Sequence, residues 1–168
     1  LVEYARKYIG TPYRRGSKGP NRFDCSGFTQ YIFNHFSYSL NASSASQYLQ
    51  GISVKDEEIC RGDLVFFKGR NSRRSNVGHV GLVTEVYPDG RFKFIHASTS
   101  QGIREDWNFS PYYAQRYVGA RRIYFVQIDK RLILDAILEL EDIDDNTPFT
   151  EMEKSITPQE FSTFVRAE

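Results

Sequence analysis

The sequence of 168 residues contains two cysteines and three histidines, and Cys25, His79 and His96 are the candidates among them for nucleophilic catalysis. A thiol reacts as the thiolate, and a helix N-terminus or a nearby imidazole can lower its pKa from about 8.5 to roughly 3.5–7.5. A nucleophilic cysteine also needs a base, and that base needs a third group to orient it. One cysteine and two histidines can supply such a set if the fold brings them together.

Cys25 is predicted to lie at the start of a helix. In the run CSGFTQYIFNHF (25–36), Phe28 and Ile32 are spaced as neighbours on one helical face. Asp24 is a good N-cap, because its carboxylate can accept a hydrogen bond from an unpaired amide of the first turn. The thiol is therefore expected at the positive end of the helix dipole.

The two histidines are predicted to lie on neighbouring strands. The segments 79–87 and 91–97 are rich in β-branched and aromatic residues, and a Pro-Asp-Gly turn joins them. His79 opens the first segment and His96 lies near the end of the second. Because a hairpin makes the strands antiparallel, both imidazoles are expected near the same end of the sheet.

The remaining segments predict an α+β fold with an antiparallel sheet, since helices come first and strands follow. Further helices are expected at 2–9 and 43–50, and further strands at 63–67 and 119–128. We expect a catalytic domain over residues 1–128. Residues 129–168 are expected to form an acidic, helical C-terminal extension, whose role the sequence does not reveal.

The charge of the chain is unevenly distributed. Residues 1–122 carry 18 Lys and Arg against 10 Asp and Glu, a balance of +8, whereas residues 123–168 carry 4 against 11, a balance of −7. The sum is the net charge of +1. A basic body favours a polyanionic partner or a carboxylate-rich substrate, although ordinary surface charge explains it equally well.

The composition excludes several classes of protein. Hydrophobic residues at 40% and aromatic residues at 15% are ample for a packed core. Apolar runs are short, as at 64–67, so no transmembrane segment is predicted. No signal peptide is visible, and we interpret the chain as a mature or trimmed one. Two cysteines are too few for a disulfide scaffold, and no nucleic-acid-binding motif is present.

Other interpretations of Cys25 are a buried structural residue, half of a disulfide with Cys60, or a metal ligand. A metal site formed by Cys25, Cys60, His79 and His96 has suitable ligand types but lacks the short Cys-x-x-Cys or His-x-x-x-His pairs usual for zinc. We expect no metal and no cofactor. Packing would explain Cys60, and His35 is expected to be a surface residue at a helix end.

From about residue 2 to residue 125, the sequence resembles the NlpC-type cysteine peptidases (the NlpC/p-sixty family), which are papain-like cell-wall hydrolases. Seven segments follow the family's order: GTPYRRGS, FDCSGFTQYIF, SSASQY, GDLVFF, VGHVGLV, FIHAST and RYVGARRI. No single segment would be persuasive, but seven in order are. The resemblance implies a papain-like fold, with N-terminal helices packed on a central antiparallel sheet and the nucleophile at a helix N-terminus.

The resemblance also implies a role for each catalytic residue. Cys25 would be the nucleophile, His79 the base, and His96 the polar third member that orients His79. Tyr13 matches the tyrosine whose hydroxyl supports the oxyanion site.

Substrate-binding residues follow from the same comparison. Asp24 and Ser26, which flank the nucleophile, match positions that hold the polar end of the stem peptide. Arg15 departs from the family's usual aromatic residue and would give the groove a cationic contact. Ser17 replaces a glycine, and residues 41–42 replace a proline and an arginine, so the details of the subsites are expected to differ.

The implied activity is that of an extracytoplasmic endopeptidase acting on peptidoglycan stem peptides. The bond would join D-γ-glutamate to a diamino acid, either diaminopimelate or lysine. One alternative is an amidase or acyltransferase on the same fold. Another is a catalytically silent wall-binding module, although binding alone would not need a nucleophile. Neither the diamino acid nor the oligomeric state can be deduced from the sequence.

Overall fold

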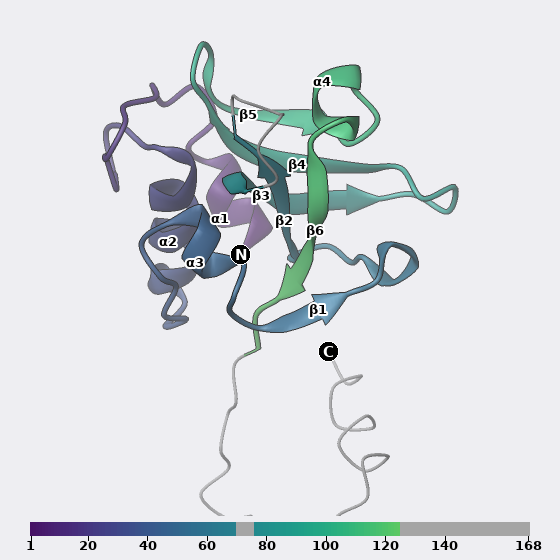
Figure 1. Cartoon of the computed structure of the whole chain (residues 1–168). Coiled ribbons are helices and arrows are strands. Elements are labelled where there is room, and N and C mark those ends of the chain that lie inside the picture. The colour runs from purple at the N-terminus through teal and green to yellow at the C-terminus, as the bar shows by residue number, and fades with distance from the viewer. Residues whose placement is uncertain (70–75, 125–168) are drawn as a thin grey trace, which may run out of the picture. The chain divides into compact units, whose positions relative to one another are not determined.

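The computed structural model describes residues 1–69 and 76–124, in which the first three α-helices cover one face of a six-stranded sheet (Figure 1). The helices are α1 (Val2–Arg6), α2 (Cys25–His35), α3 (Ser44–Gln47), the 3-10 helix η1 (Asp56–Glu58) and α4 (Pro111–Ala114). The strands are β1 (Ile52–Val54), β2 (Leu64–Lys68), β3 (Val77–Val86), β4 (Phe92–Ser98), β5 (Gly102–Trp107) and β6 (Tyr117–Arg122). The predicted α+β class is confirmed.

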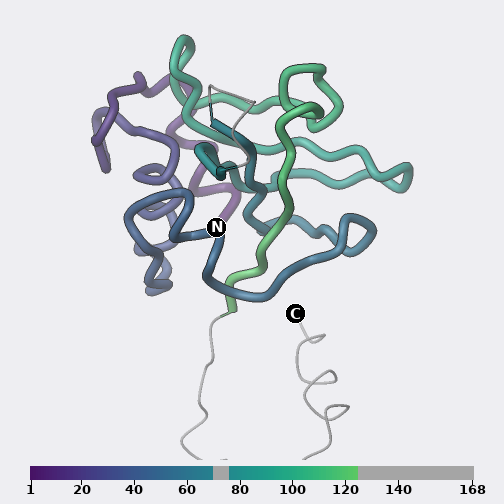
Figure 2. Tube along the Cα trace, in the orientation of Figure 1, coloured from purple at the N-terminus to yellow at the C-terminus, as the bar shows by residue number. Residues whose placement is uncertain are grey.

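The sheet is antiparallel throughout, in the order β1-β6-β2-β3-β4-β5. The predicted hairpin is confirmed, because β3 pairs with β4 from Leu82 opposite Ile95 to Val86 opposite Phe92. The turn of this hairpin projects away from the helices, as the backbone trace shows (Figure 2). The opposite end of the hairpin, which carries His79 and His96, therefore lies toward α2.

Each face of the sheet has its own apolar core. On the helical face, Phe28 and Ile32 of α2 are fully buried in a cluster with Leu82 and Ile95 of the hairpin. These two α2 positions are the ones whose spacing predicted the helix, and burying such side chains is the main force that holds a helix on a sheet. The helical face fixes α2, and with it the position of Cys25.

The opposite face carries the second core. Phe67 and Phe94 are buried there, and their rings lie 4.9 Å apart between centroids. Tyr113 of α4 covers both, with ring centroids 5.3 Å from Phe67 and 5.0 Å from Phe94. Because side chains alternate along a strand, His96 lies on the same face as Phe94.

Several predictions of element boundaries need correction. The first helix ends at Arg6 and continues only as turns up to Gly10, and β6 is shorter than the predicted strand over 119–128. Four elements were not predicted: β1, η1, β5 and α4. The predicted C-terminal extension lies outside the described residues, so its boundary stays a prediction. No helix in the described ranges is long and apolar enough to cross a membrane.

Candidate active site

Asp24 caps the helix that begins at Cys25, as the sequence predicts. Its carboxylate accepts a hydrogen bond from the amide of Gly27 at 2.6 Å, and its other oxygen accepts one from the amide of Gly16 at 2.9 Å. The capping residue is therefore shared between the helix and the loop that precedes it. This arrangement holds Cys25 as the first helical residue.

The loop 14–22 packs tightly on the first turn of α2. A side chain at Gly27 would collide with the carbonyl oxygen of Ser17, so glycine is required at this contact. The backbone amide of Asp24 donates to that same carbonyl at 2.8 Å. We name residues 14–22 the cationic loop, because Arg14, Arg15, Lys18 and Arg22 all lie exposed on it.

The thiol lies against the part of β3 that precedes its pairing with β4. Cys25 Sγ is 4.0 Å from the carbonyl oxygen of Gly78, the residue before His79. The amide of Val80, the residue after His79, also points toward the sulfur, as does the amide of Ser26. Helix α2 thus presents its thiol to the backbone on both sides of His79.

His79 and His96 are joined by a hydrogen bond. His79 Nε2 lies 2.9 Å from His96 Nδ1, and the two rings are nearly perpendicular, at 85°. Gly81 makes room for them, since a Cβ there would lie 2.6 Å from Phe94 Cδ2 and 3.3 Å from His96 Cβ. The prediction that both imidazoles lie at the same end of the sheet is confirmed.

His96 is held from its far side by two residues that the sequence analysis missed. His96 is fully buried, and its Nε2 lies 2.8 Å from Asp106 Oδ2 and 3.3 Å from the Tyr113 hydroxyl. Asp106 lies on β5 and Tyr113 on α4, the elements that were not predicted. The available signal in GIREDW was weak, because Arg104 and Asp106 have the two-residue spacing of one strand face but Glu105 between them breaks any alternation of polar with apolar residues.

The electrostatics correct one expectation from the sequence. Burial and, after it, the negative charge of Asp24 together raise the pKa of the Cys25 thiol to about 11, against a smaller opposing effect from nearby amides. Burial lowers the pKa of His79 to about 3, and His96 contributes to this shift. At neutral pH the resting pair is therefore a neutral thiol and a neutral imidazole. The helix N-terminus does not lower the pKa of the thiol here, because burial outweighs it.

This electrostatic arrangement predicts how Cys25 should react with iodoacetamide. Because only the thiolate is alkylated, the rate at Cys25 should rise about tenfold for each pH unit from about pH 7 to about pH 10. Mass spectrometry of the Cys25 peptide measures that rate. Asp24→Asn keeps a good N-cap and should move the profile to lower pH, whereas Asp89→Asn, in the hairpin turn, should not. A rate independent of pH between about pH 6 and 9 would contradict this prediction.

The other predicted residues lie around the nucleophile. Tyr13 forms an isolated backbone bridge with Phe23, two residues before Cys25. The Ser26 hydroxyl is buried and donates to the carbonyl oxygen of Ala42 at 3.0 Å. Arg15 is exposed on the cationic loop. The roles of Tyr13, Ser26 and Arg15 toward a substrate stay predictions, as does that of Asp24.

The structure also bears on the alternative interpretations of the cysteines as disulfide partners, packing residues or metal ligands. Cys25 and Cys60 are both free thiols. Cys60 is exposed, so the expectation that packing explains it is wrong. In the part of the chain that the structure describes, no group of three or more His, Cys, Asp or Glu side chains is placed to hold a metal ion.

His35 is the last residue of α2. Its side chain is exposed and stacks on Tyr4, with ring centroids 3.9 Å apart, which confirms its predicted position.

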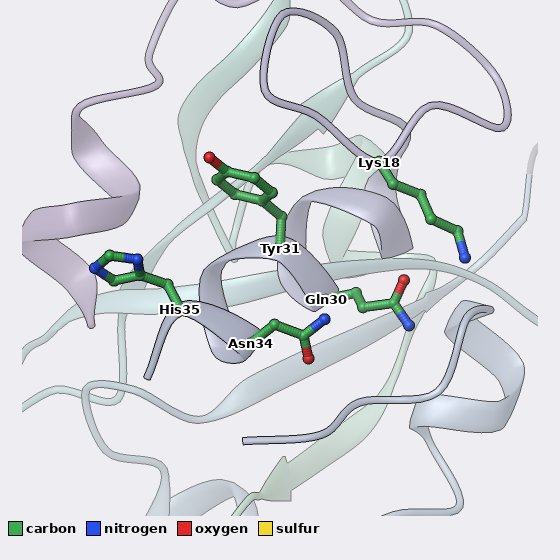
Figure 3. Close-up of a pocket in the computed structure, with 5 residues that line it drawn as sticks. All are labelled: Lys18, Gln30, Tyr31, Asn34 and His35. Atoms are coloured by element: carbon green, nitrogen blue, oxygen red, sulfur yellow. The ribbon is translucent and has the colours of Figure 1, made fainter. Parts of the chain in front are cut away.

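A cavity of about 340 Å³ lies along α2 (Figure 3). It is lined by Lys18, Gln30, Tyr31, Asn34 and His35. Figure 3 shows that Lys18 reaches it from the cationic loop, while the other four come from successive turns of α2. None of the predicted catalytic side chains lines this cavity, so it is separate from the thiol.

Comparison with known sequences identifies relatives of this chain. The sequence profile of the NlpC/P60 family matches residues 10–122. A Haemophilus influenzae protein described as a probable endopeptidase is 36% identical over 124 residues, which are 73% of this chain and 73% of that protein. The gamma-DL-glutamyl hydrolase of Bacillus subtilis is 33% identical over 132 residues, or 77% of this chain but only 30% of the hydrolase. The match to a Listeria grayi protein described as the probable endopeptidase p60 spans only 15% of that relative.

Solved structures resemble this fold as well. An NlpC/P60 family protein from Bacillus cereus is 29% identical, with a TM-score of 0.65, over 72% of this chain and 38% of that protein. The NlpC/p60 domain of the peptidoglycan hydrolase SagA is 27% identical, with a TM-score of 0.59, over 73% of this chain and 95% of that domain. The architecture described above is therefore shared with these domains.

Proposed function

This chain belongs to the NlpC/P60 family, and we propose that it is a cysteine endopeptidase that hydrolyses peptidoglycan stem peptides outside the cytoplasm. One observation carries the proposal: a thiol at a helix start lies against the strand of His79, which is hydrogen-bonded to the buried His96. Pure binding would not need this set of groups, which disfavours a silent wall-binding module. The SagA domain, to which the fold is similar, is described as part of a peptidoglycan hydrolase.

Hydrolysis would begin with attack of the Cys25 sulfur on the carbonyl carbon of the scissile amide. Because the resting thiol is neutral, its proton must leave during the attack, and His79 is the base that receives it. His79 Nε2 faces His96, so the proton goes to Nδ1. The C–N bond then breaks, the imidazolium returns this proton to the departing amine, and a thioester to Cys25 remains.

The oxyanion formed in this step needs hydrogen-bond donors. The backbone amide of Cys25, at the start of α2, is one donor, and the Tyr13 hydroxyl is the other that we propose. His79 then takes a proton from a water molecule, whose oxygen attacks the thioester. The acyl–sulfur bond breaks, the carboxylic acid product leaves, and the proton returns to the sulfur. Apart from the peptide substrate, the reaction consumes only water, and Cys25 and His79 return to their starting states.

The substrate that fits this site best is a short peptide rich in carboxylates. Within the described residues, none of the four cations of the cationic loop forms an ion pair. Cations elsewhere, such as Arg6 and Arg122, are paired with carboxylates. Unpaired guanidinium groups beside the nucleophile suit peptide carboxylates, which they bind in bidentate geometry.

The scissile bond that we propose joins D-γ-glutamate to a diamino acid, diaminopimelate or lysine. Asp24 or Ser26 would hold an amine of the stem peptide and Arg15 a carboxylate. The Bacillus subtilis relative is described as a gamma-DL-glutamyl hydrolase, which supports a γ-glutamyl bond.

The test is digestion of purified muropeptides, followed by mass spectrometry, with casein as a control substrate. We expect release of peptides ending in D-glutamate and no cleavage of casein. Stem peptides amidated at their carboxylates should have kcat/KM reduced about tenfold or more, because the guanidinium groups lose their counter-charge. Arg15→Gln should remove much of this preference, whereas Lys55→Gln, which changes an exposed cation outside the loop, should leave it unchanged.

Other outcomes of the same digestion would overturn the proposal. Cleavage of casein with unchanged muropeptides would indicate a general papain-like protease. Loss of an amide group or transfer of an acyl group, without a peptide break, would indicate an amidase or acyltransferase on this fold. Binding to the wall without any product would indicate a wall-binding module.

A further inference from the structure

We propose that Asp106 is a positioning residue, which sets the tautomers of His96 and His79 so that His79 Nδ1 can accept a proton from Cys25. Nothing in the sequence motifs assigns a role to this aspartate. The inference rests on the proposed function for its catalytic consequence, but its structural part can be tested without any substrate.

Asp106 is placed by the register of β4 and β5. His96 pairs with Arg104, and Phe94 pairs with Asp106. Side chains at these four positions share one face of the sheet, so Asp106 is the diagonal neighbour of His96. This geometry produces the 2.8 Å contact between Asp106 Oδ2 and His96 Nε2. The contact is therefore a consequence of the strand pairing.

The carboxyl group of Asp106 is ionised. Its second oxygen accepts a hydrogen bond from Arg104 Nη2 at 2.5 Å. Burial raises the pKa of Asp106, but the hydrogen bonds from His96 and Arg104 and the positive charge of Arg104 outweigh it, so the net pKa is lowered. An ionised carboxylate can only accept hydrogen bonds. His96 Nε2 must therefore carry a proton toward Asp106.

The proton position on His96 determines the proton position on His79. Burial lowers the pKa of His96 despite the hydrogen bond to Asp106, so this ring is neutral and carries only one proton. With that proton on Nε2, His96 Nδ1 is an acceptor, and it lies 2.9 Å from His79 Nε2. His79 must then carry its own proton on Nε2. Its Nδ1 keeps a lone pair, which a base for the Cys25 thiol requires.

Among the described residues, few other polar groups lie close enough to form hydrogen bonds with the ring nitrogens of His96 and His79. The polar side chains facing His96 are His79 from β3, Arg104 and Asp106 from β5, and Tyr113 from α4. The Tyr113 hydroxyl, at 3.3 Å from His96 Nε2, can either donate or accept, so it imposes no tautomer. Next to the His79 ring are His96 and the ring of Tyr113, while the Cys25 thiol lies against the carbonyl oxygen of the preceding residue, Gly78. Of the groups named here that form hydrogen bonds with the two rings, the Asp106 carboxylate alone can accept a hydrogen bond but never donate one.

The first measurement uses the unchanged protein with ¹⁵N-labelled histidine. Two-dimensional NMR of the ring nitrogens at neutral pH reports which nitrogen carries the proton. We expect the Nε2–H tautomer for both His96 and His79. A wild-type His96 that carries its proton on Nδ1 would overturn the proposal by itself.

The decisive variant is Asp106→Asn. An asparagine amide placed at Oδ2 donates to His96 Nε2, which moves the His96 proton to Nδ1 and forces His79 into the Nδ1–H form. That form cannot accept the thiol proton. We expect the NMR signature of both rings to switch, and kcat to fall on the order of 10²–10⁴-fold with KM changed little.

Two further variants separate positioning from a structural role. Asp106→Glu can still only accept a hydrogen bond, so it should keep the Nε2–H tautomers and recover most of kcat. Asp89→Asn, which makes the same chemical change in the hairpin turn, should alter neither tautomers nor rates. If Asp106→Asn keeps the wild-type tautomers, or if Asp106→Glu is as inactive as Asp106→Asn, the proposal is wrong. A tautomer switch in a protein that cleaves no peptide would leave the positioning role standing and refute only the peptidase.

Discussion

Replacement of Cys25 by alanine should abolish hydrolysis of stem peptides, with kcat lowered on the order of 10⁴-fold or more. The reason is that no thioester can form without the sulfur, and water must then attack the amide directly. Alanine keeps the Cβ of Cys25 and removes only the sulfur of a partly exposed side chain, so little packing is lost and the protein should remain folded. Muropeptide digestion followed by mass spectrometry measures the loss, and thermal unfolding shows whether the fold is kept.

Cys60→Ala is the matched control for this substitution. Cys60 is exposed, and its sulfur contacts only the carbonyl oxygen of Glu58, at 3.4 Å, among the described residues. The variant should therefore keep wild-type activity and stability. If Cys25→Ala retained full activity, or if Cys60→Ala lost it, the assignment of the nucleophile would fail.

Replacement of His79 by alanine should be almost as damaging, with kcat reduced on the order of 10³–10⁶-fold. The resting thiol of Cys25 is protonated, because burial and the charge of Asp24 raise its pKa to about 11. Without His79 the proposed acceptor for the thiol proton at neutral pH is lost. The loss should be partly relieved at high pH, where hydroxide generates the thiolate directly. Activity that persists at pH 7 would show that another base acts.

Variants at His96 test the orienting role separately. His96→Gln should retain a measurable fraction of activity, since the amide oxygen can accept from His79 Nε2–H while the amide nitrogen donates to Asp106. His96→Ala leaves both partners without a hydrogen bond and should be much less active. His35→Ala, at the exposed end of α2, is the matched histidine control and should be unaffected. Equal inactivity of His96→Gln and His79→Ala would show that His96 does more than orient the base.

Local sequence determined the elements that carry Cys25 and the two histidines. An aspartate before an apolar helical pattern specifies a capped helix, because its carboxylate pairs with first-turn amides wherever the helix lies. A Pro-Asp-Gly turn between two β-rich segments specifies a hairpin in the same way, since neighbours in sequence become neighbours in space. The predictions for Asp24, Cys25, His79 and His96 therefore agree with the positions that the structure gives them.

The tertiary structure alone decided which groups surround these residues. The strand GIREDW has three charged or polar residues in succession, and it is a strand because β4 offers its free edge, which local propensity does not encode. That pairing brings Asp106 to His96, and the second apolar core brings Tyr113. The pKa of Cys25 was also decided at this level. A helix N-terminus favours the thiolate, but burial against β3 and the carboxylate of Asp24 favour the thiol, and desolvation prevails once the helix is packed on the sheet.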